Sequence, residues 1–325
     1  MEILKSLNQL AAPLGPSVVT LGNFDGVHLG HRELFRHLVK KSRQLGCRSV
    51  VYTFDPHPLK FLAPEKAPLL LNTPEEKQRL IAASHVDLLV EAPFTLELAS
   101  KSPEQFVDEV LVGGLQTRAL VIGYDYAFGK GRRGDAAFLQ ACGAAKGFSV
   151  EVLQPVGADG EPYSSTRIRQ LIAAGEVSEV VALLGRHYNL EGRVVPGEQR
   201  GRVLGFPTAN LVTAKEQLPA PGVYAVKVRY QQQEFNGVVN LGRRPTFGGG
   251  NSTIEVHLID YTGRLYDQSL RIYFVERLRP ERKFAGPREL TDAIAADVLR
   301  ARQCLENVQI VQYREYLSFR RDDPQ

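Results

Sequence analysis

The strongest constraint on the fold is a change of sequence pattern near residue 185. Before it, short β-rich runs alternate with amphipathic helical stretches; after it, strand-like runs follow one another, divided by Gly, Pro and Asn. Alternating strands and helices are typical of a parallel sheet with helices on its faces, and successive strands are typical of a small antiparallel barrel. The sequence therefore predicts an α/β domain over residues 1–185 and a β-barrel domain over residues 186–325.

Local patterns locate the elements of both domains. In the first we expect strands at 17–22, 49–54, 86–93, 118–125 and 148–155, and helices at 30–45, 165–174 and 177–184. Thr73 and Ser102 each precede a proline, a combination that marks a helix start. In the second we expect strands at 189–195, 222–230, 236–242, 252–260 and 270–278. A helix over 287–305 follows, with Leu290, Ile294, Val298 and Leu305 at helical spacing.

Composition excludes several classes of protein. No apolar run approaches the roughly 18 to 20 residues of a membrane helix, and the N-terminal segment lacks an export signal, so we expect a cytoplasmic protein. The three cysteines, Cys47, Cys142 and Cys304, are far apart and odd in number, which predicts reduced, buried thiols rather than disulfides or a metal knuckle. A net charge of +4 favours small phosphorylated ligands over DNA or RNA.

The first chemical pattern is a pair of histidines in residues 19–35, where a strand passes through a glycine-containing loop into a helix. His28 and His31 are three residues apart, so they share a helical face. A helix N-terminus offers unpaired N–H groups and partial positive charge, to which two imidazoles add donors. The pattern predicts a phosphate site, and Gly22, Gly26 and Gly30 permit close approach of the backbone.

Other interpretations of this half stay open. The two histidines are also compatible with zinc ligation, although the sequence offers no cluster that completes a ligand shell, or with plain surface positions. Residues 129–134 fit the G-x-G-x-x-G pattern of a dinucleotide oxidoreductase. That motif is weak alone, is unusually basic here, and follows several β/α elements rather than the opening strand.

A second phosphate-binding pattern lies at residues 163–169, YSSTRIR. Ser164 or Ser165 is suited to cap the following helix, and Arg167 and Arg169 bring guanidinium groups to its positive end. The arrangement predicts a phosphate clamp. An exposed basic helix with a good N-cap is the plainer alternative.

The third pattern lies in residues 192–210 of the barrel half, a Gly- and Arg-rich segment that ends in Pro207, Thr208, Ala209 and Asn210. Gly-rich backbone surrounds polyphosphates in many proteins. Thr208 and Asn210 are two residues apart in an extended segment, so both offer neutral oxygens on one face, as Mg²⁺ requires when nucleotide phosphates and water supply its other ligands. An ordinary barrel loop with turn residues is the alternative.

Taken together, these motifs resemble a known family. The H-x-G-H signature at 28–31 resembles that of nucleotidylyltransferases, and with TFDPHP at 53–58, VIGYDYAFGKGRRGD at 121–135 and YSSTRIR it resembles the FMN adenylyltransferase module of bacterial bifunctional riboflavin kinase/FAD synthetases. In the barrel half, GRVLGFPTAN, PGVYAV, NLGRRPTF and STIEVHLID resemble the riboflavin kinase domain. The fold implied is a Rossmann-like nucleotidylyltransferase domain followed by a small antiparallel barrel with a C-terminal helix.

The resemblance also implies roles for individual residues. His28 and His31 would be catalytic in the first domain, and Glu255 would accept the proton of the riboflavin 5′-hydroxyl in the second. Residues implied to bind ATP or its phosphates are Gly22, Phe24, Asp25, Gly26, Ser164, Ser165, Thr166, Arg167, Arg169, Gly201, Arg202 and Gly205. Asp55, Asp125, Phe128 and Asn240 would lie near the flavin, with Asp125 and Phe128 near flavin or adenine, and Thr208 and Asn210 would hold the metal. Tyr126 departs from the Phe that relatives often have after position 125.

The implied function is the conversion of riboflavin to FMN and of FMN to FAD, each with ATP and with Mg²⁺ as cofactor. We expect no nucleic-acid or membrane partner, and a monomer or weak homo-oligomer. Two alternatives are kept: a riboflavin kinase with a degenerate first domain, and a flavin-binding regulator or carrier, in contact with RNA, that has lost turnover. Both predict loss of motif residues, and Glu255, Thr208 and the paired histidines are all present.

Overall fold

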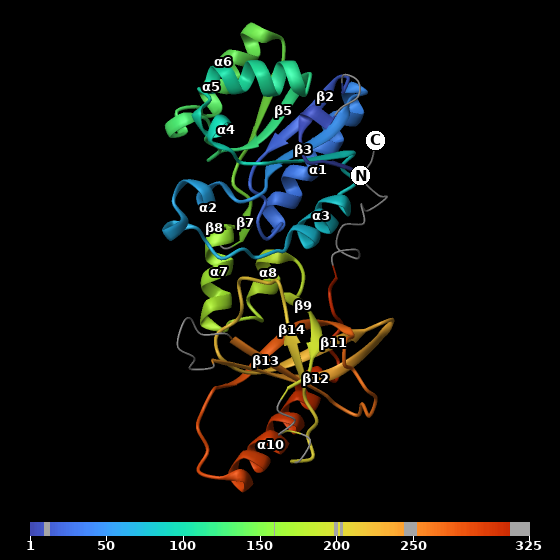
Figure 1. Ribbon diagram of the computed structural model, residues 1–325. Helices are drawn as coiled ribbons and strands as arrows, with labels where there is room; N and C mark the ends of the chain where they lie inside the picture. The colour runs from blue at the N-terminus through green and yellow to red at the C-terminus, as the bar shows by residue number, and fades with distance from the viewer. Residues whose placement is uncertain (10–13, 159, 198–200, 202–203, 244–251, 313–325) are drawn as a thin grey trace. The chain divides into compact units, whose positions relative to one another are not determined.

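The computed structural model describes residues 1–9, 14–158, 160–197, 201, 204–243 and 252–312, and Figure 1 traces their elements. The chain forms two compact units, Met1–Ser165 and Thr166–Gln325. This division comes earlier than residue 185 because the end of helix α7 (Ser165–Ala174) packs with the second unit: Arg277 donates to the Ala174 carbonyl at 3.0 Å and the Ala220 amide to Ile172 at 3.2 Å. The assignment of functional domains to 1–185 and 186–325 stays a prediction.

A six-stranded parallel sheet forms the centre of the first unit, in the order β1-β4-β3-β2-β5-β6. Its strands are β1 (Glu2–Leu4), β2 (Ser17–Leu21), β3 (Arg48–Phe54), β4 (Leu88–Ala92), β5 (Thr117–Gly123) and β6 (Ser149–Leu153). Strands β2 and β4 are buried along their whole length, as expected for a parallel sheet covered on both faces. The strand order reverses at β2, which has β3 on one side and β5 on the other.

Helices and short turns connect these strands. The helices are α1 (Leu29–Leu45), α2 (Pro58–Leu62), α3 (Pro74–Ala82), α4 (Leu96–Ser100), α5 (Pro103–Gln105) and α6 (Ala136–Lys146), with a π-helical segment η3 (Phe106–Gly114) and 3-10 turns η1 (Leu7–Gln9), η2 (Pro64–Lys66) and η4 (Lys130–Arg132). A hairpin of β7 (Gly157–Ala158) and β8 (Glu161–Pro162) precedes α7. The predicted N-caps are confirmed: Thr73 and Ser102 each form a capping box, with Glu76 and Gln105.

The second unit is a closed antiparallel barrel in the order β10-β13-β12-β11-β14-β9. Its strands are β9 (Asn189–Val195), β10 (Ala209–Val212), β11 (Gly222–Tyr230), β12 (Gln233–Arg243), β13 (Ser252–Leu258) and β14 (Ser269–Pro280), and its helices besides α7 are α8 (Val180–Leu184) and α10 (Pro287–Leu305). Helix α10 covers β11, β12 and β14, where Ala301 and Leu305 join Val223, Ala225 and Leu278 in one core cluster. The predicted fold class is therefore confirmed.

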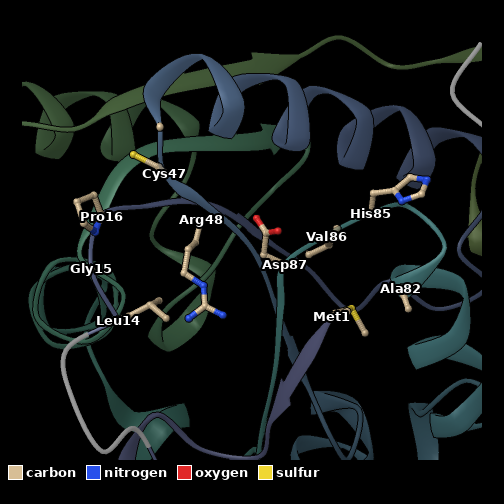
Figure 2. A pocket seen from close by; sticks show the side chains of 11 residues that line it. Met1, Leu14, Gly15, Pro16, Cys47, Arg48, Ala82, His85, Val86 and Asp87 are labelled. Carbon is tan, nitrogen blue, oxygen red and sulfur yellow. The ribbon is translucent and has the colours of Figure 1, made fainter. Parts of the chain in front are cut away.

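A cavity of about 720 Å³ lies at the amino ends of the strands in the first unit (Figure 2). Two of its charged lining residues already have partners: Arg48 pairs with Glu2 at 2.6 Å, and the Asp87 carboxylate accepts the Ser49 amide and hydroxyl. Of the residues predicted for catalysis or binding, those that the structure describes do not line it. None of the helices in the described ranges combines the length and hydropathy of a membrane span. The three cysteines are free thiols, half-buried rather than buried as the sequence predicts.

Candidate active sites

The loop between β2 and α1, residues 22–28, lies where the strand order of the sheet reverses. Open α/β sheets bind ligands at this switch point, outside the carboxyl ends of the strands. Within the loop, Phe24 and Val27 adopt φ values of 47° and 39°, a sparsely populated conformation for non-glycine residues that clusters at functional sites. The loop is thus held in a defined shape at the position that the fold reserves for a ligand.

Contacts from the next loop explain that shape. Gly26 has a φ of 83°, and a Cβ at this position would lie 2.7 Å from Leu71 Cδ1, so the backbone requires glycine. The buried Asp25 carboxylate accepts the Leu71 amide at 3.0 Å and the Asn72 amide at 3.2 Å. The Asp25 side chain therefore fastens residues 71–72 to the loop, a role that its predicted phosphate contact did not anticipate.

The two histidines stand together at the start of α1. His28 is the N-cap, and its Nδ1 accepts the His31 amide at 3.4 Å. The imidazole rings are stacked, with centroids 3.7 Å apart and planes 21° apart, which confirms that they share a face. Phe24, predicted to bind ATP, is buried and packs edge-on against the His31 ring at 5.3 Å. The arrangement presents two imidazoles and a helix N-terminus in one place.

The YSSTRIR segment contributes Ser165, the last residue of the first unit. Its hydroxyl donates to the Asp25 carbonyl at 2.8 Å, which ties the start of α7 to the histidine loop. Thr166 and Arg167 are exposed, and Ser164 and Arg169 are half-buried. Their roles stay predictions.

Other predicted residues follow the strands beside β2. Asp55 follows β3, its amide donating to the Ala92 carbonyl at 3.0 Å, and Asp125 is exposed after β5. Phe128 is only 8% exposed and packs against Phe106 and Tyr126, with centroids 5.3 and 5.7 Å away. Most of its ring thus lies in the core, and its ligand contact stays a prediction. The G-x-G-x-x-G segment forms a paired turn in which Phe128 and Gly134 exchange two backbone hydrogen bonds, at 2.9 and 3.0 Å.

Sequence reasoning missed an aromatic surface at the same end of the sheet. Phe94, two residues after β4, makes edge contacts with Phe54 at 5.4 Å and with Phe61 at 6.1 Å. Phe61 is 44% exposed, and its neighbours in α2, Leu59 and Leu62, are exposed as well. Such an apolar surface suits a planar aromatic ligand. The signal was available in the phenylalanines that follow β3 and β4.

In the barrel, strand register aligns three predicted residues. Glu255 on β13 is paired with Asn210 on β10 and, on its other side, with Asn240 on β12. Residues directly opposite in an antiparallel sheet have Cβ atoms about 4.5 to 5.5 Å apart and point to the same face. The predicted base, a predicted metal ligand and a predicted flavin residue therefore form one row across three strands.

This row lines a cavity of about 580 Å³, together with Gly201 and Thr208. A second cavity, of about 620 Å³, is lined by Pro207, Thr208, Ala209 and the segment from Tyr261 to Tyr266. Thr208 borders both. Arg202 lies outside the described residues, and Gly205 is exposed with a φ of 86°.

Two supports of this row have no role assigned to them from the sequence, although His257 was expected on the same strand face as Glu255. Gly197 lies against Asn210 so closely that a Cβ there would overlap the Asn210 amide. His257 extends the strand pairing: the β10–β13 register ends at Ala209 and Val256, and one step further the His257 Nδ1 donates to the Pro207 carbonyl at 2.9 Å. Because a carbonyl only accepts, Nδ1 carries the proton.

Helix α10 forms an apolar wall of the cavity that holds the Asn210, Glu255 and Asn240 row, with Leu290, Ile294 and Val298. At the edge of this wall, Arg279 makes a two-pronged contact with Asp297, at 2.8 to 3.0 Å. The sequence predicted the apolar stripe of α10 but assigned it only to packing on the barrel.

Comparisons with known proteins agree with both sites. The FAD synthetase family model matches residues 11–167 and the riboflavin kinase model matches residues 184–305. A bifunctional riboflavin kinase/FMN adenylyltransferase of Pseudomonas fluorescens is 41% identical over 304 residues, covering 93% of this chain and 97% of that protein. The chain belongs to this family. The enzyme of the same name from Escherichia coli K12 is 37% identical over 305 residues, with the same shares covered.

A solved structure supports the fold of the family member. It is a crystal structure of a protein named macrolide-efflux protein from Streptococcus pneumoniae, 33% identical, with a TM-score of 0.84, covering 94% of this chain and 99% of that chain. The predicted family and enzyme class are thus confirmed, and the oxidoreductase alternative has no support among these matches.

Proposed function

We propose that the barrel unit phosphorylates riboflavin to FMN and that the first unit adenylylates FMN to FAD, each with its own ATP. The observation that supports this division best is the row of Asn210, Glu255 and Asn240 inside one cavity of the barrel. The stacked histidines are in the other unit, so the predicted catalytic residues of the two reactions lie in different units.

In the kinase step, the cavity that α10 covers holds the flavin, and its apolar wall contacts the ring system. Glu255 accepts the proton of the riboflavin 5′-hydroxyl. The hydroxyl oxygen bonds to the γ-phosphorus of ATP, and the bond between this phosphorus and the β–γ bridging oxygen breaks to release ADP. ATP occupies the second cavity, which Pro207, Thr208 and Ala209 line. Gly201, which lines the flavin cavity, and Gly205 stay predicted contacts of its phosphates. Thr208 borders both cavities, which suits a residue at the point of transfer.

The described residues fit a metal ion that arrives with the nucleotide. They contain no group of three His, Cys, Asp or Glu side chains able to hold one alone. Thr208 and Asn210 offer two neutral oxygens, so the nucleotide phosphates would complete the ligand shell. When bound, Mg²⁺ neutralises charge on the phosphates of ATP.

In the adenylylation step, a phosphate oxygen of FMN attacks the α-phosphorus of ATP, and pyrophosphate leaves. The nucleophile is already anionic and needs no strong base. His28 and His31 instead stabilise charge on the reacting phosphorus and the leaving group. Arg167 and Arg169 stay predicted phosphate contacts of the same reaction. The aromatic surface of Phe54, Phe61 and Phe94 receives the flavin ring, near Asp55.

A product assay tests the division of labour. Wild-type protein with riboflavin and MgATP should yield FMN and FAD; absence of both products refutes the proposal. Glu255→Ala should stop FMN formation but spare FAD synthesis from added FMN. The double variant His28→Ala/His31→Ala should do the reverse, since removing one transition-state donor typically costs roughly 2.7 to 4 kcal/mol. Loss of both activities in either folded variant contradicts it.

Other expectations stay proposals. We propose a cytoplasmic enzyme that acts as a monomer or weak homo-oligomer without a nucleic-acid partner. Size-exclusion chromatography with light scattering, with and without added RNA, checks the last two points. A stable complex with RNA would favour the regulator alternative.

A further inference from the structure

One half-buried cation at the carboxyl end of the sheet, Lys77, has no part in the mechanism above. Lys77 projects from α3 to the end of β3, where its Nζ lies 3.4 Å from both Thr53 Oγ1 and the Phe54 carbonyl. Thr53 Oγ1 in turn donates to the Asn23 carbonyl at 3.2 Å. Lys77 thus lies between the β2–α1 loop, residues 22–28, and the segment that begins at Asp55.

The hydrogen bonds of Lys77 are weak for an ammonium group. Among the described residues its two bonds are long and end on neutral oxygens, whereas ammonium groups that meet anions bond at about 2.7 to 2.9 Å. An ammonium has three N–H donors. Lys77 therefore retains donor capacity at the edge of the sheet where α/β proteins bind ligands.

Nearby carboxylates face this cation, but in the described residues they bind other partners. Glu91 on β4 is 1% exposed and accepts Lys5 Nζ at 2.6 Å and Gln78 Nε2 at 2.7 Å, and Asp25 accepts backbone amides. Burial lowers the pKa of Lys77, and nearby carboxylates act in the opposite direction. The charged groups that face Lys77 are Glu91 on β4, Asp55 after β3, Asp25 after β2 and Lys5 after β1.

We propose that the Lys77 ammonium binds the phosphate of FMN during adenylyl transfer. The inference rests on the proposed function of the first unit. Lys77 keeps its proton throughout: it orients the phosphate oxygen that bonds to the α-phosphorus of ATP as the bond to pyrophosphate breaks. The position favours FMN over ATP because Phe54, which Lys77 contacts, belongs to the aromatic surface assigned to the flavin ring.

The test replaces the cation by an apolar side chain of similar length. Lys77→Met should raise the KM for FMN about tenfold or more, as expected for a lost charged hydrogen bond, and leave the KM for ATP within about twofold. Riboflavin kinase activity of the same variant should not change. Lys77→Arg should stay near wild type. Lys40→Met, on the exposed side of α1, is the matched control and should behave as wild type.

A structural explanation makes a different prediction. Glu91 Oε1 is buried without a hydrogen-bond partner among the described residues, so Lys77 has the alternative role of balancing Glu91. In that case the double variant Lys77→Met/Glu91→Gln regains activity. If Lys77 binds phosphate, the double variant keeps the high KM for FMN.

The pH dependence adds an independent measurement. Only charged Lys77 binds phosphate, and its pKa is lowered, so the KM for FMN should rise as pH increases through that pKa. Lys77→Arg should lack this alkaline rise, because arginine stays protonated.

Four results would contradict the inference. An unchanged KM for FMN, a rise confined to the KM for ATP, recovery in the double variant, or an inactive Lys77→Arg enzyme would each do so. Failure of the proposed function is distinguishable, because then the wild type itself makes no FAD from FMN.

Discussion

The single hydrogen bond from His257 to the Pro207 carbonyl yields a sharp prediction about the kinase site. The bond is 2.9 Å long and continues the pairing of β10 and β13 beyond its last backbone pair. Pro207 directly precedes Thr208, which borders both cavities. Asparagine places its amide nitrogen close to the position of Nδ1, whereas glutamine reaches toward the position of Nε2. His257→Asn should therefore keep the bond and His257→Gln should lose it.

The magnitude follows from the bond. A neutral hydrogen bond contributes about 0.5 to 1.5 kcal/mol net. If that energy positions Thr208 for transfer, its loss lowers the rate of FMN formation about 2-fold to about 12-fold, at 1.36 kcal/mol per factor of ten. The assay follows FMN formation at saturating riboflavin, with Mg²⁺ and ATP titrated separately. A Thr208 that has moved should also raise the Mg²⁺ concentration needed for half-maximal rate.

Comparing His257→Asn with His257→Gln tests whether the hydrogen bond to Pro207 positions Thr208. His257→Asn should stay within about twofold of wild type, whereas His257→Gln should show the full loss, and both should make FAD from added FMN at the normal rate. Equal rates for the two variants would refute the positioning role. An equal fall in FAD synthesis would show a general loss of folded enzyme instead.

Two further predictions concern the barrel unit. Gly197→Ala should displace the Asn210 amide and weaken Mg²⁺-dependent FMN formation about tenfold or more, given the cost of a close contact in a packed site. Gly286→Ala is the control, because its backbone is extended and no neighbour lies within 4 Å of the added Cβ. An unaffected Gly197→Ala kinase would contradict the role of Asn210. Burial lowers the pKa of His187, whose Nδ1 accepts the Val311 amide, so the unfolded chain binds a proton more readily than the folded one. Barrel stability should therefore be complete above the unfolded pKa near 6.5 and fall as pH decreases toward 5. Melting curves against pH check this, and His187→Gln should flatten the dependence; an equal slope in the variant would exclude His187 as its source.

Much of the fold could be predicted because periodicity is a local property. The strands at 49–54 and 222–230 and the helix at 287–305 fall close to β3, β11 and α10. Strand β10 was missed because residues 207–210 carry a proline and a functional motif, which favoured a loop. Only its pairing with β9 and β13, remote in sequence, defines it as a strand.

In the candidate sites too, local spacing could be predicted from the sequence and strand pairing could not. His28 and His31 were predicted together because three residues on a helix fix their separation. The row of Asn210, Glu255 and Asn240 depends on the register of three strands, which alternation alone does not set.

Contacts between distant segments account for the functional residues that sequence reasoning missed. Lys77 lies on α3 among ordinary polar residues, and only the meeting of α3 with the end of β3 brings it to Thr53. His257 looks like one polar residue of an alternating strand until the end of β10 places Pro207 beside it. In both cases a side-chain nitrogen donates a hydrogen bond to an oxygen of a residue that is far away in the sequence. Substitutions at these two residues will therefore distinguish side chains that contact substrate from side chains that position other residues.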